Sequence, residues 1–170
     1  FVLYVGDINY NKNIPGLIQA AKLAKLPLVM VGRQAKDIEK MDLNHPELVH
    51  LSMNYELITN YPIRLGFVSD EDLVDIYNLA SVYCQPSFSE GFGLNPLEAL
   101  ACGTPVASSN RGSLPEVLGD NAAYFDPGDA KAMSQAIIEA QSSKGSKVQS
   151  KLSWDQTAKD TLQVYKSLCP

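Results

Sequence analysis

Short apolar segments alternate with segments of helical periodicity along most of this chain. Short, mostly apolar runs expected to be strands occupy residues 1–5, 28–31, 63–68, 82–85, 104–108 and 122–125, and a further short strand is expected near 48–51. Strands that are apolar on consecutive residues are typical of parallel sheets covered by helices on both faces. The alternation therefore predicts an α/β fold with a parallel sheet, in which ligands bind beyond the carboxyl ends of the strands.

Several helix starts can be identified from capping residues. Asn13 precedes an amphipathic segment that has Pro15 in its first turn, and Ser113 precedes another segment, with Glu116 three residues later. Ser69 is likewise followed at the same spacing by Asp72, which predicts a helix start there. The triplet 70–72 could be read as a metal-binding Asp-x-Asp, but acidic residues also favour the positive end of a helix dipole. We favour the second interpretation.

Composition narrows the range of functions. The 170 residues carry a formal charge of −5, which argues against general nucleic-acid binding. The longest apolar runs are far shorter than the roughly 20 residues of a membrane-spanning helix. Cys84, Cys102 and Cys169 are unclustered, which indicates buried thiols in a reducing, cytoplasmic setting. His45 and His50 have no cluster of partner ligands, so no metal site is expected.

The densest segment of possible site residues runs from 86 to 106. Gly91 and Gly93 allow a tight turn that brings backbone N–H groups close to a ligand. Asn95 can cap the following helix, and Pro96 suits its first position. The N-terminus of that helix would attract an anion such as phosphate.

Two acidic residues accompany this loop, and each has a structural and a functional interpretation. Glu98 lies three residues after Asn95, the spacing of a capping-box partner, and could instead bind a ligand. Glu90 could be a solvated loop acid or a site residue.

The whole segment is more specific than its parts. Glu90-Gly-Phe-Gly-Leu-x-Pro-x-Glu98, followed by Ala-x-Ala-Cys-Gly-x-Pro, closely resembles the E-x7-E signature of the retaining GT-B glycosyltransferases of group 1, also called family 4. The likeness extends to Tyr4-Val-Gly6 with Lys12, to residues 66–73, and to the end of the chain. Further matching positions are Tyr77, Ala80, Leu114-Pro-Glu-Val117, Phe125-Asp-Pro127 and Ser153-Trp154.

The resemblance implies a domain organisation. Family members have two Rossmann-like domains facing a cleft, and this chain resembles the C-terminal, donor-binding one. Residues 1–150 would form the nucleotide-sugar donor-binding domain, and 151–170 its C-terminal helix. Since the chain begins inside a strand and without Met, we interpret it as part of a longer protein whose N-terminal acceptor domain is absent. Such a chain would bind the donor without turning over by itself.

The resemblance also implies roles for individual residues. Glu90 would contact the donor sugar, and Glu98 would hydrogen-bond the ribose. Lys12 would bind the pyrophosphate beside Gly6, and it would share the catalytic role with Glu90. Backbone N–H groups of the loop would meet the sugar and the distal phosphate, and backbone groups near β-strand 63–68 would contact the base. The loop residues are Gly91, Phe92, Gly93 and Leu94, and those near the base are Arg64 and Leu65.

Two positions depart from the family pattern. Asp7 stands where an arginine is usual, and a carboxylate pointing inward would repel a phosphate. Arg33 or Arg111 could supply the missing cation, although each is also an ordinary surface residue. Asn95 stands where proline is common, a mild change.

The resemblance predicts transfer of a sugar from a nucleotide-diphosphate donor to a hydroxyl acceptor with retention of configuration and without metal or other cofactor. The pattern around Lys12-Asn13 and 109–116 is most similar to bacterial mannosyl- and related transferases of surface polysaccharide assembly. The acceptor would be a sugar or a lipid-linked sugar, and the missing domain would bring peripheral contact with the inner membrane face. The alternatives are an epimerase-like GT-B enzyme and a noncatalytic nucleotide-sugar-binding module, which a repulsive Asp7 would favour.

Overall fold

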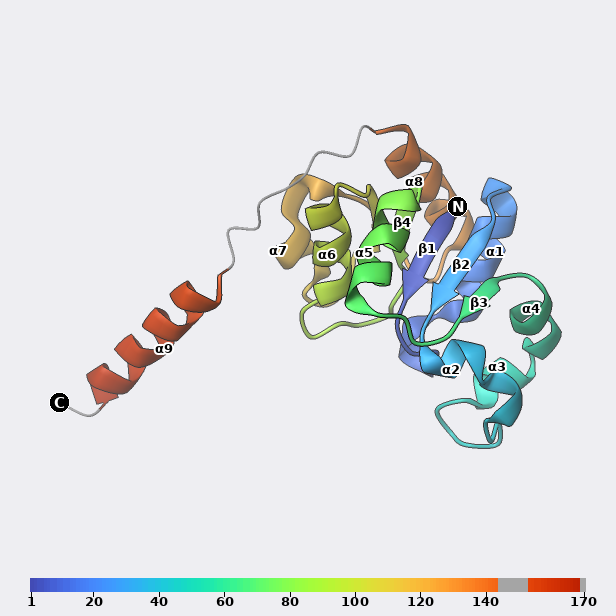
Figure 1. Cartoon of the computed structure of the whole chain (residues 1–170), viewed down its shortest axis with the longest axis horizontal. Coiled ribbons are helices and arrows are strands. Elements are labelled where there is room, and N and C mark those ends of the chain that lie inside the picture. Colours follow the sequence, from blue (N-terminus) through green and yellow to red (C-terminus); the bar gives the residue numbers. More distant parts are fainter. Residues whose placement is uncertain (144–152, 169–170) are drawn as a thin grey trace.

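The computed structural model describes residues 1–143 and 153–168 and contains one six-stranded parallel sheet (Figure 1). In spatial order the strands are β3 (Ile63–Leu65), β2 (Leu28–Val31), β1 (Val2–Val5), β4 (Val82–Gln85), β5 (Val106–Ser109) and β6 (Ala122–Phe125). Every adjacent pair is parallel. The sheet grows outward from β1 in both directions, so the topological switch point lies between β1 and β4. The predicted α/β fold is confirmed.

Helices cover both faces of the sheet. One face carries α1 (Ile14–Ala24), α2 (Arg33–Lys36), α3 (Val49–Ser52), α4 (Tyr55–Asn60) and α8 (Ala130–Ser142), and the other carries α5 (Asp70–Leu79), α6 (Leu94–Cys102) and α7 (Leu114–Leu118). The elements η1 (Tyr10–Lys12), η2 (Ile38–Lys40) and η3 (Gly119–Asn121) are short 3-10 helices. Ser69 caps α5 by accepting the N–H of Asp72 at 3.1 Å, which confirms the helix start predicted there.

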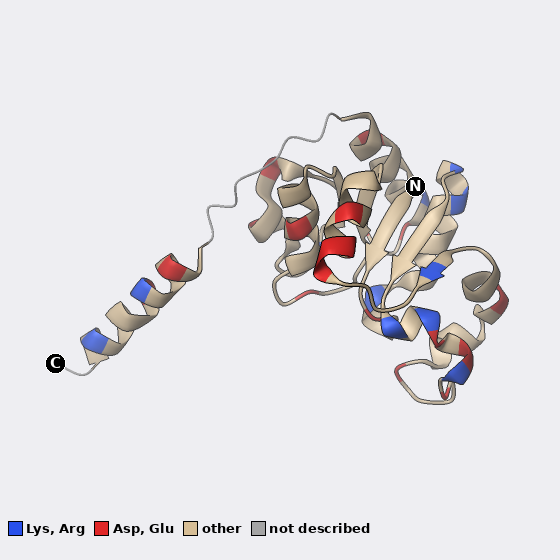
Figure 2. Cartoon of the chain, in the orientation of Figure 1, with Lys and Arg blue, Asp and Glu red and all other residues tan. Residues whose placement is uncertain are grey.

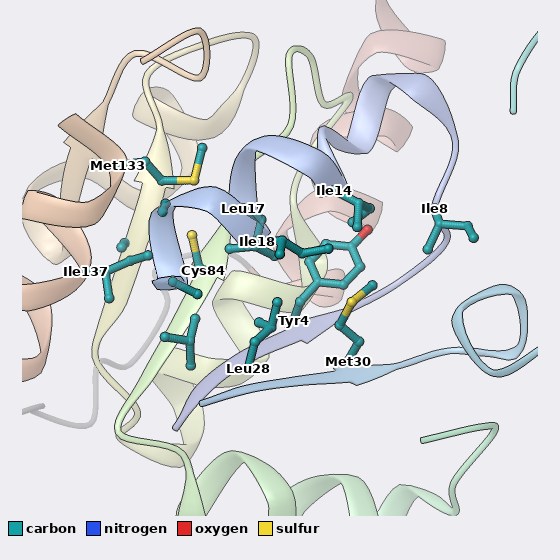
Figure 3. Close-up of a cluster of buried hydrophobic side chains, with 14 of the residues drawn as sticks. Tyr4, Ile8, Ile14, Leu17, Ile18, Leu28, Met30, Cys84, Met133 and Ile137 are labelled. Carbon is teal, nitrogen blue, oxygen red and sulfur yellow. The ribbon is translucent and has the colours of Figure 1, made fainter. Parts of the chain in front are cut away.

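Consecutive residues of the central strands enter different cores. Tyr4 and Cys84 join the cluster under α1 and α8, shown in Figure 3, whereas their neighbours Leu3 and Tyr83 join the cluster under α5 to α7. All four side chains are fully buried. This two-sided burial explains why the strands are apolar at successive positions rather than alternately.

The short strand predicted near 48–51 is wrong, because that segment forms α3. Leu48 and Leu51 are both buried and lie three residues apart, so they fall on one face of a helical turn. The N–H groups of Leu48 and Val49 bond to the carbonyl of His45 at 2.8 and 2.9 Å, a local pattern that no strand could make. A short apolar run cannot distinguish these two outcomes.

The last described helix, α9 (Trp154–Leu168), lies away from the sheet in Figure 1, and none of its residues is buried. Its inclusion in the same domain stays a prediction. Residues 144–152 and 169–170, which the predicted domain and its C-terminal helix include, lie outside the described residues, and Cys169 is among them. Across the two described ranges, the helices are too short or too polar to span a bilayer.

Candidate functional site

The candidate site lies at the carboxyl ends of β1 and β4, where the switch point predicts a ligand. The backbone turns sharply after β1 at Gly6, whose φ is +144° and whose N–H donates to the carbonyl of Val31. The loop after β2 approaches it closely, because a Cβ at Gly32 would lie 2.3 Å from the Gly6 carbonyl oxygen. Only glycine allows this approach of two backbones.

Two loops that are distant in sequence are joined beside this turn. The N–H of Phe88 donates to the carbonyl of Asn11 at 2.8 Å, and the Asn11 side-chain amide donates to the carbonyl of Ser89. The ring of Tyr10 stacks on the ring of Phe88 with a centroid distance of 5.5 Å. These contacts place Lys12, on η1, against the loop that follows β4.

Lys12 and Glu90, both predicted site residues, form an ion pair. Lys12 Nζ lies 2.6 Å from Glu90 Oε1, and the two side chains are 23% and 14% exposed. The same oxygen accepts the Ser87 hydroxyl at 2.6 Å and the Gln85 amide Nε2 at 2.9 Å. A carboxylate with several donors is held firmly in one orientation. The structure thus brings the two predicted catalytic residues into contact.

The loop after β5 supports the backbone of Glu90. The Ser113 hydroxyl donates to the Glu90 carbonyl at 2.9 Å. Gly112 has a φ of +62°, and a Cβ there would lie 2.8 Å from the same carbonyl oxygen. Ser113 was expected to cap α7, but its side chain makes no cap, because it is used at Glu90 instead. The contribution of this loop therefore has no signal in the sequence, where Ser113 matches a helix cap.

The buried side chain of Asn13 ties three elements together at the start of α1. Its amide Nδ2 donates to the carbonyls of Pro86 and Pro127 at 3.2 and 2.7 Å. Asn13 occupies the N-cap position with a φ of +50°, yet its side chain does not cap the helix as predicted. The amide instead connects the loops after β4 and β6 to the loop that carries Lys12.

The N-terminus of α6 faces the same edge of the sheet, but its first turn differs from the prediction. Gly93 occupies the N-cap position with a φ of +96°, and the helix begins at Leu94. Asn95 therefore lies inside the first turn, where its amide donates to the carbonyl of Val5 at 2.6 Å and fixes α6 to β1. Pro96 is third rather than first in the helix, still where an N–H has no intrahelical acceptor.

Glu98 is not a capping-box partner of Asn95. Its Oε2 accepts the hydroxyl of Tyr77, from α5, at 3.0 Å, and the residue is exposed. Burial and then the neighbouring Glu98 carboxylate raise the pKa of Tyr77, so the phenol keeps its proton and acts as the donor. The exposed loop residues Gly91 and Phe92 lie between the two glutamates in sequence.

Arg64 and Leu65, predicted near the base, lie on β3. The Arg64 guanidinium binds Glu39 at 2.6 Å and the carbonyl of Ala35 at 3.3 Å, so its charge is used within the fold. The Leu65 carbonyl accepts the N–H of Gly32 at 3.3 Å.

Asp7 stands where the family usually has an arginine, and Arg33 and Arg111 were the residues expected to replace that positive charge. The side chain of Asp7 is exposed, and its carbonyl accepts the buried hydroxyl of Tyr4. Arg111 pairs with Asp126 at 2.8 Å, whereas Arg33 stacks over the exposed ring of Phe67 at 5.2 Å.

The described residues contain no cluster of His, Cys, Asp or Glu suited to a metal ion. The acidic triplet 70–72 forms the first turn of α5, visible in red in Figure 2.

Comparison with known proteins agrees with this architecture. A family model described as glycosyl transferases group 1 matches residues 1–160. The O-antigen chain mannosyltransferase B of Escherichia coli is 35% identical over 99% of this chain and 46% of its own length. An uncharacterized glycosyltransferase of Methanocaldococcus jannaschii is 30% identical over 97% of this chain and 44% of its own.

Solved structures share the fold. The sucrose-phosphate synthase of Thermosynechococcus elongatus superposes with a TM-score of 0.73 at 28% identity, covering 98% of this chain and 45% of that one. Anabaena HepE, solved in complex with UDP-glucose, superposes with a TM-score of 0.63 at 22% identity, covering 82% and 38%. The chain spans about half the length of the first of these relatives. With the family model matched from the first strand into the last helix, the chain belongs to the glycosyl transferases of group 1.

Proposed function

We propose that this chain is the donor-binding half of a retaining glycosyltransferase that moves a sugar from a nucleotide diphosphate to a hydroxyl acceptor. The observation that carries the proposal is the contact of Lys12 with Glu90 at the switch point of the sheet, beside the start of α6. This arrangement puts a cation, a carboxylate and a helix N-terminus at one place. Those are the groups that a sugar diphosphate would use.

The positive elements suit the diphosphate. Breaking the bond between sugar and phosphate leaves negative charge on the leaving group, which a fixed cation and a helix N-terminus stabilise without reorganising. Lys12 and the first backbone N–H groups of α6 would supply both, with Gly6 allowing the phosphates close to the backbone. Since these groups already provide positive charge, we expect the reaction to need no metal ion.

The two glutamates suit the sugar and the ribose. A carboxylate accepts hydrogen bonds from vicinal hydroxyls, and Glu90 and Glu98 lie on either side of the glycine turn. The complex of Anabaena HepE with UDP-glucose supports a nucleotide-sugar ligand for this fold, and the E. coli mannosyltransferase supports mannose as the sugar. For retention, an oxygen of the departing diphosphate would help to deprotonate the acceptor on the face that the leaving group vacates.

Calorimetry tests the proposal. The chain is titrated with UDP, GDP and ADP and with their common sugar conjugates, in the presence and absence of a chelator. We expect one nucleotide to bind, and Lys12→Ala and Glu98→Ala each to weaken it about fivefold, which corresponds to one hydrogen bond of roughly 1 kcal/mol. Lys22→Met is the matched control, since Lys22 lies in the last turn of α1 over the Tyr61 ring.

A chain that binds none of these ligands is then tested as part of a complete polypeptide with an N-terminal domain. Continued absence of binding there would refute the proposal, as would binding that Lys12→Ala and Lys22→Met weaken equally.

A further inference from the structure

Two buried polar side chains on β4 lie behind Glu90, and the proposed function gives neither of them a contact with the ligand. Tyr83 and Gln85 are 0% and 3% exposed, and because they are alternate residues of one strand they lie on the same face of the sheet. A strand interior normally carries apolar side chains here, and a buried amide destabilises the fold unless its polar atoms are bonded. A glutamine at this position therefore needs an explanation.

The two side chains form a chain of hydrogen bonds that runs from Tyr83 through Gln85 to Glu90 and is called the relay below. The Tyr83 hydroxyl donates to Gln85 Oε1, and Gln85 Nε2 donates to Glu90 Oε1 at 2.9 Å and to the Ser87 hydroxyl at 2.8 Å. The chemistry fixes the direction, since a carboxylate can only accept and must meet the amide nitrogen. Burial raises the pKa of the Tyr83 phenol well above its usual range, so the phenol keeps its proton for Gln85.

All hydrogen bonds to the Glu90 side chain from the described residues end on one oxygen. Lys12, Ser87 and Gln85 meet at Oε1, which leaves Oε2 for other partners. Lys12 is charged, long and partly exposed, and a diphosphate would compete for it. Ser87 and Gln85 are buried, so their hold on Oε1 does not depend on Lys12.

We propose that Gln85, oriented by Tyr83, is a positioning residue that keeps the Glu90 carboxylate aimed at the donor sugar while Lys12 turns to the diphosphate. This inference rests on the proposed function. It assigns the relay to recognition of the sugar alone, because the nucleotide and its phosphates do not depend on the aim of Glu90. Loss of the relay should therefore weaken binding of a nucleotide sugar and leave binding of the bare diphosphate unchanged.

The experiment measures, by calorimetry, the ratio of the affinities for a nucleotide sugar and its diphosphate, using UDP-glucose with UDP and GDP-mannose with GDP. Gln85→Met keeps the length of the side chain and removes both polar ends. Tyr83→Phe removes only the hydroxyl that orients the amide. Tyr61→Phe is the matched control, because its partly buried hydroxyl donates to the carbonyl of Leu26, far from the relay in sequence. Far-ultraviolet circular dichroism and thermal melting check the fold of each variant.

We expect Gln85→Met to reduce the affinity ratio about fivefold, and Tyr83→Phe to reduce it by a smaller factor in the same direction. Binding of the bare diphosphate should change less than about twofold in every variant, and the effect of Gln85→Met should persist in a Lys12→Met background. An unchanged ratio, or equal losses for both ligands, would overturn the inference and leave the proposed function standing. The inference also fails if the unmodified chain binds UDP or GDP but binds the corresponding nucleotide sugar no more tightly. Binding of no nucleotide by the complete polypeptide would instead refute the proposed function.

Discussion

Replacement of Asn13 tests how the loops of the site are held together. Its buried amide is bonded to two carbonyl oxygens, those of Pro86 and Pro127, and its backbone has a φ of +50°. Asn13→Ala would remove both hydrogen bonds and keep the unfavourable backbone conformation. Asn13→Gly would remove the same bonds while relieving the conformational strain.

The size of the effect follows from these contacts. A buried carbonyl that loses its donor costs about 1 kcal/mol or more, so the two carbonyls together cost about 2 kcal/mol. A residue with a Cβ in the left-handed region costs about 1 kcal/mol more than glycine. Asparagine tolerates this region better than alanine but less well than glycine, so we expect Asn13→Ala to lose about 2 to 3 kcal/mol and Asn13→Gly about 1 kcal/mol less than Asn13→Ala.

Equilibrium urea unfolding followed by far-ultraviolet circular dichroism gives these free energies of unfolding. Fluorescence of the single tryptophan is unsuitable, since Trp154 is 84% exposed on α9 and does not report on the sheet. Asn13→Asp keeps the shape of the side chain but places a carboxylate against two carbonyl oxygens, so it should be at least as destabilised as Asn13→Ala. A loss below about 0.5 kcal/mol in Asn13→Ala, or a glycine variant less stable than the alanine variant, would refute the reasoning.

Three further predictions concern other parts of the chain. Burial raises the pKa of the Cys84 thiol, so a thiol reagent should label Cys84 only on unfolding, which mass spectrometry of labelled peptides measures with and without urea. Tyr77→Phe should free Glu98 and reduce, about threefold, the preference for a ribonucleotide over its dideoxy counterpart in calorimetry. Arg64 holds the pKa of Glu39 below its ordinary value of 4.5, so this pair stabilises the fold above that pH and the stability is lost as pH falls through the lowered pKa. Arg64→Met should therefore flatten the fall of the urea midpoint with decreasing pH below about 5.

The sheet and the longer helices could be predicted because their signals are local. Two-sided burial makes β1 and β2 continuous apolar runs, and the helix capped by Ser69 carries its start signal within four residues. The strand predicted at 48–51 is wrong because so short a segment, Leu-Val-His-Leu, fits a strand and a helical turn equally well. The capping role predicted for Asn95 is wrong because the helix begins one residue earlier, at Leu94 with Gly93 as the N-cap, and the Asn95 amide donates to the carbonyl of Val5 in β1.

The site was predictable as a set of residues but not as a set of contacts. Lys12 and Glu90 were both identified, yet they are 78 residues apart and meet only because β1 lies beside β4. Gln85 gave no signal, since a glutamine at the end of a strand has no motif and its role depends on the partner at each end of its amide. Tertiary pairing, which a single sequence does not record, supplies that information.

Asp7 was the main argument against diphosphate binding at this loop, because a carboxylate pointing inward would repel a phosphate. The exposure of its side chain weakens that argument. Its carbonyl is held by the Tyr4 hydroxyl, while the side chain is exposed, so water and salt screen the carboxylate. Lys12, by contrast, is only 23% exposed, and a charge shielded from water acts more strongly on a nearby phosphate than one in solvent. The alternative of a module that has lost donor binding rested on a repulsive Asp7, and a solvent-exposed carboxylate gives it little support.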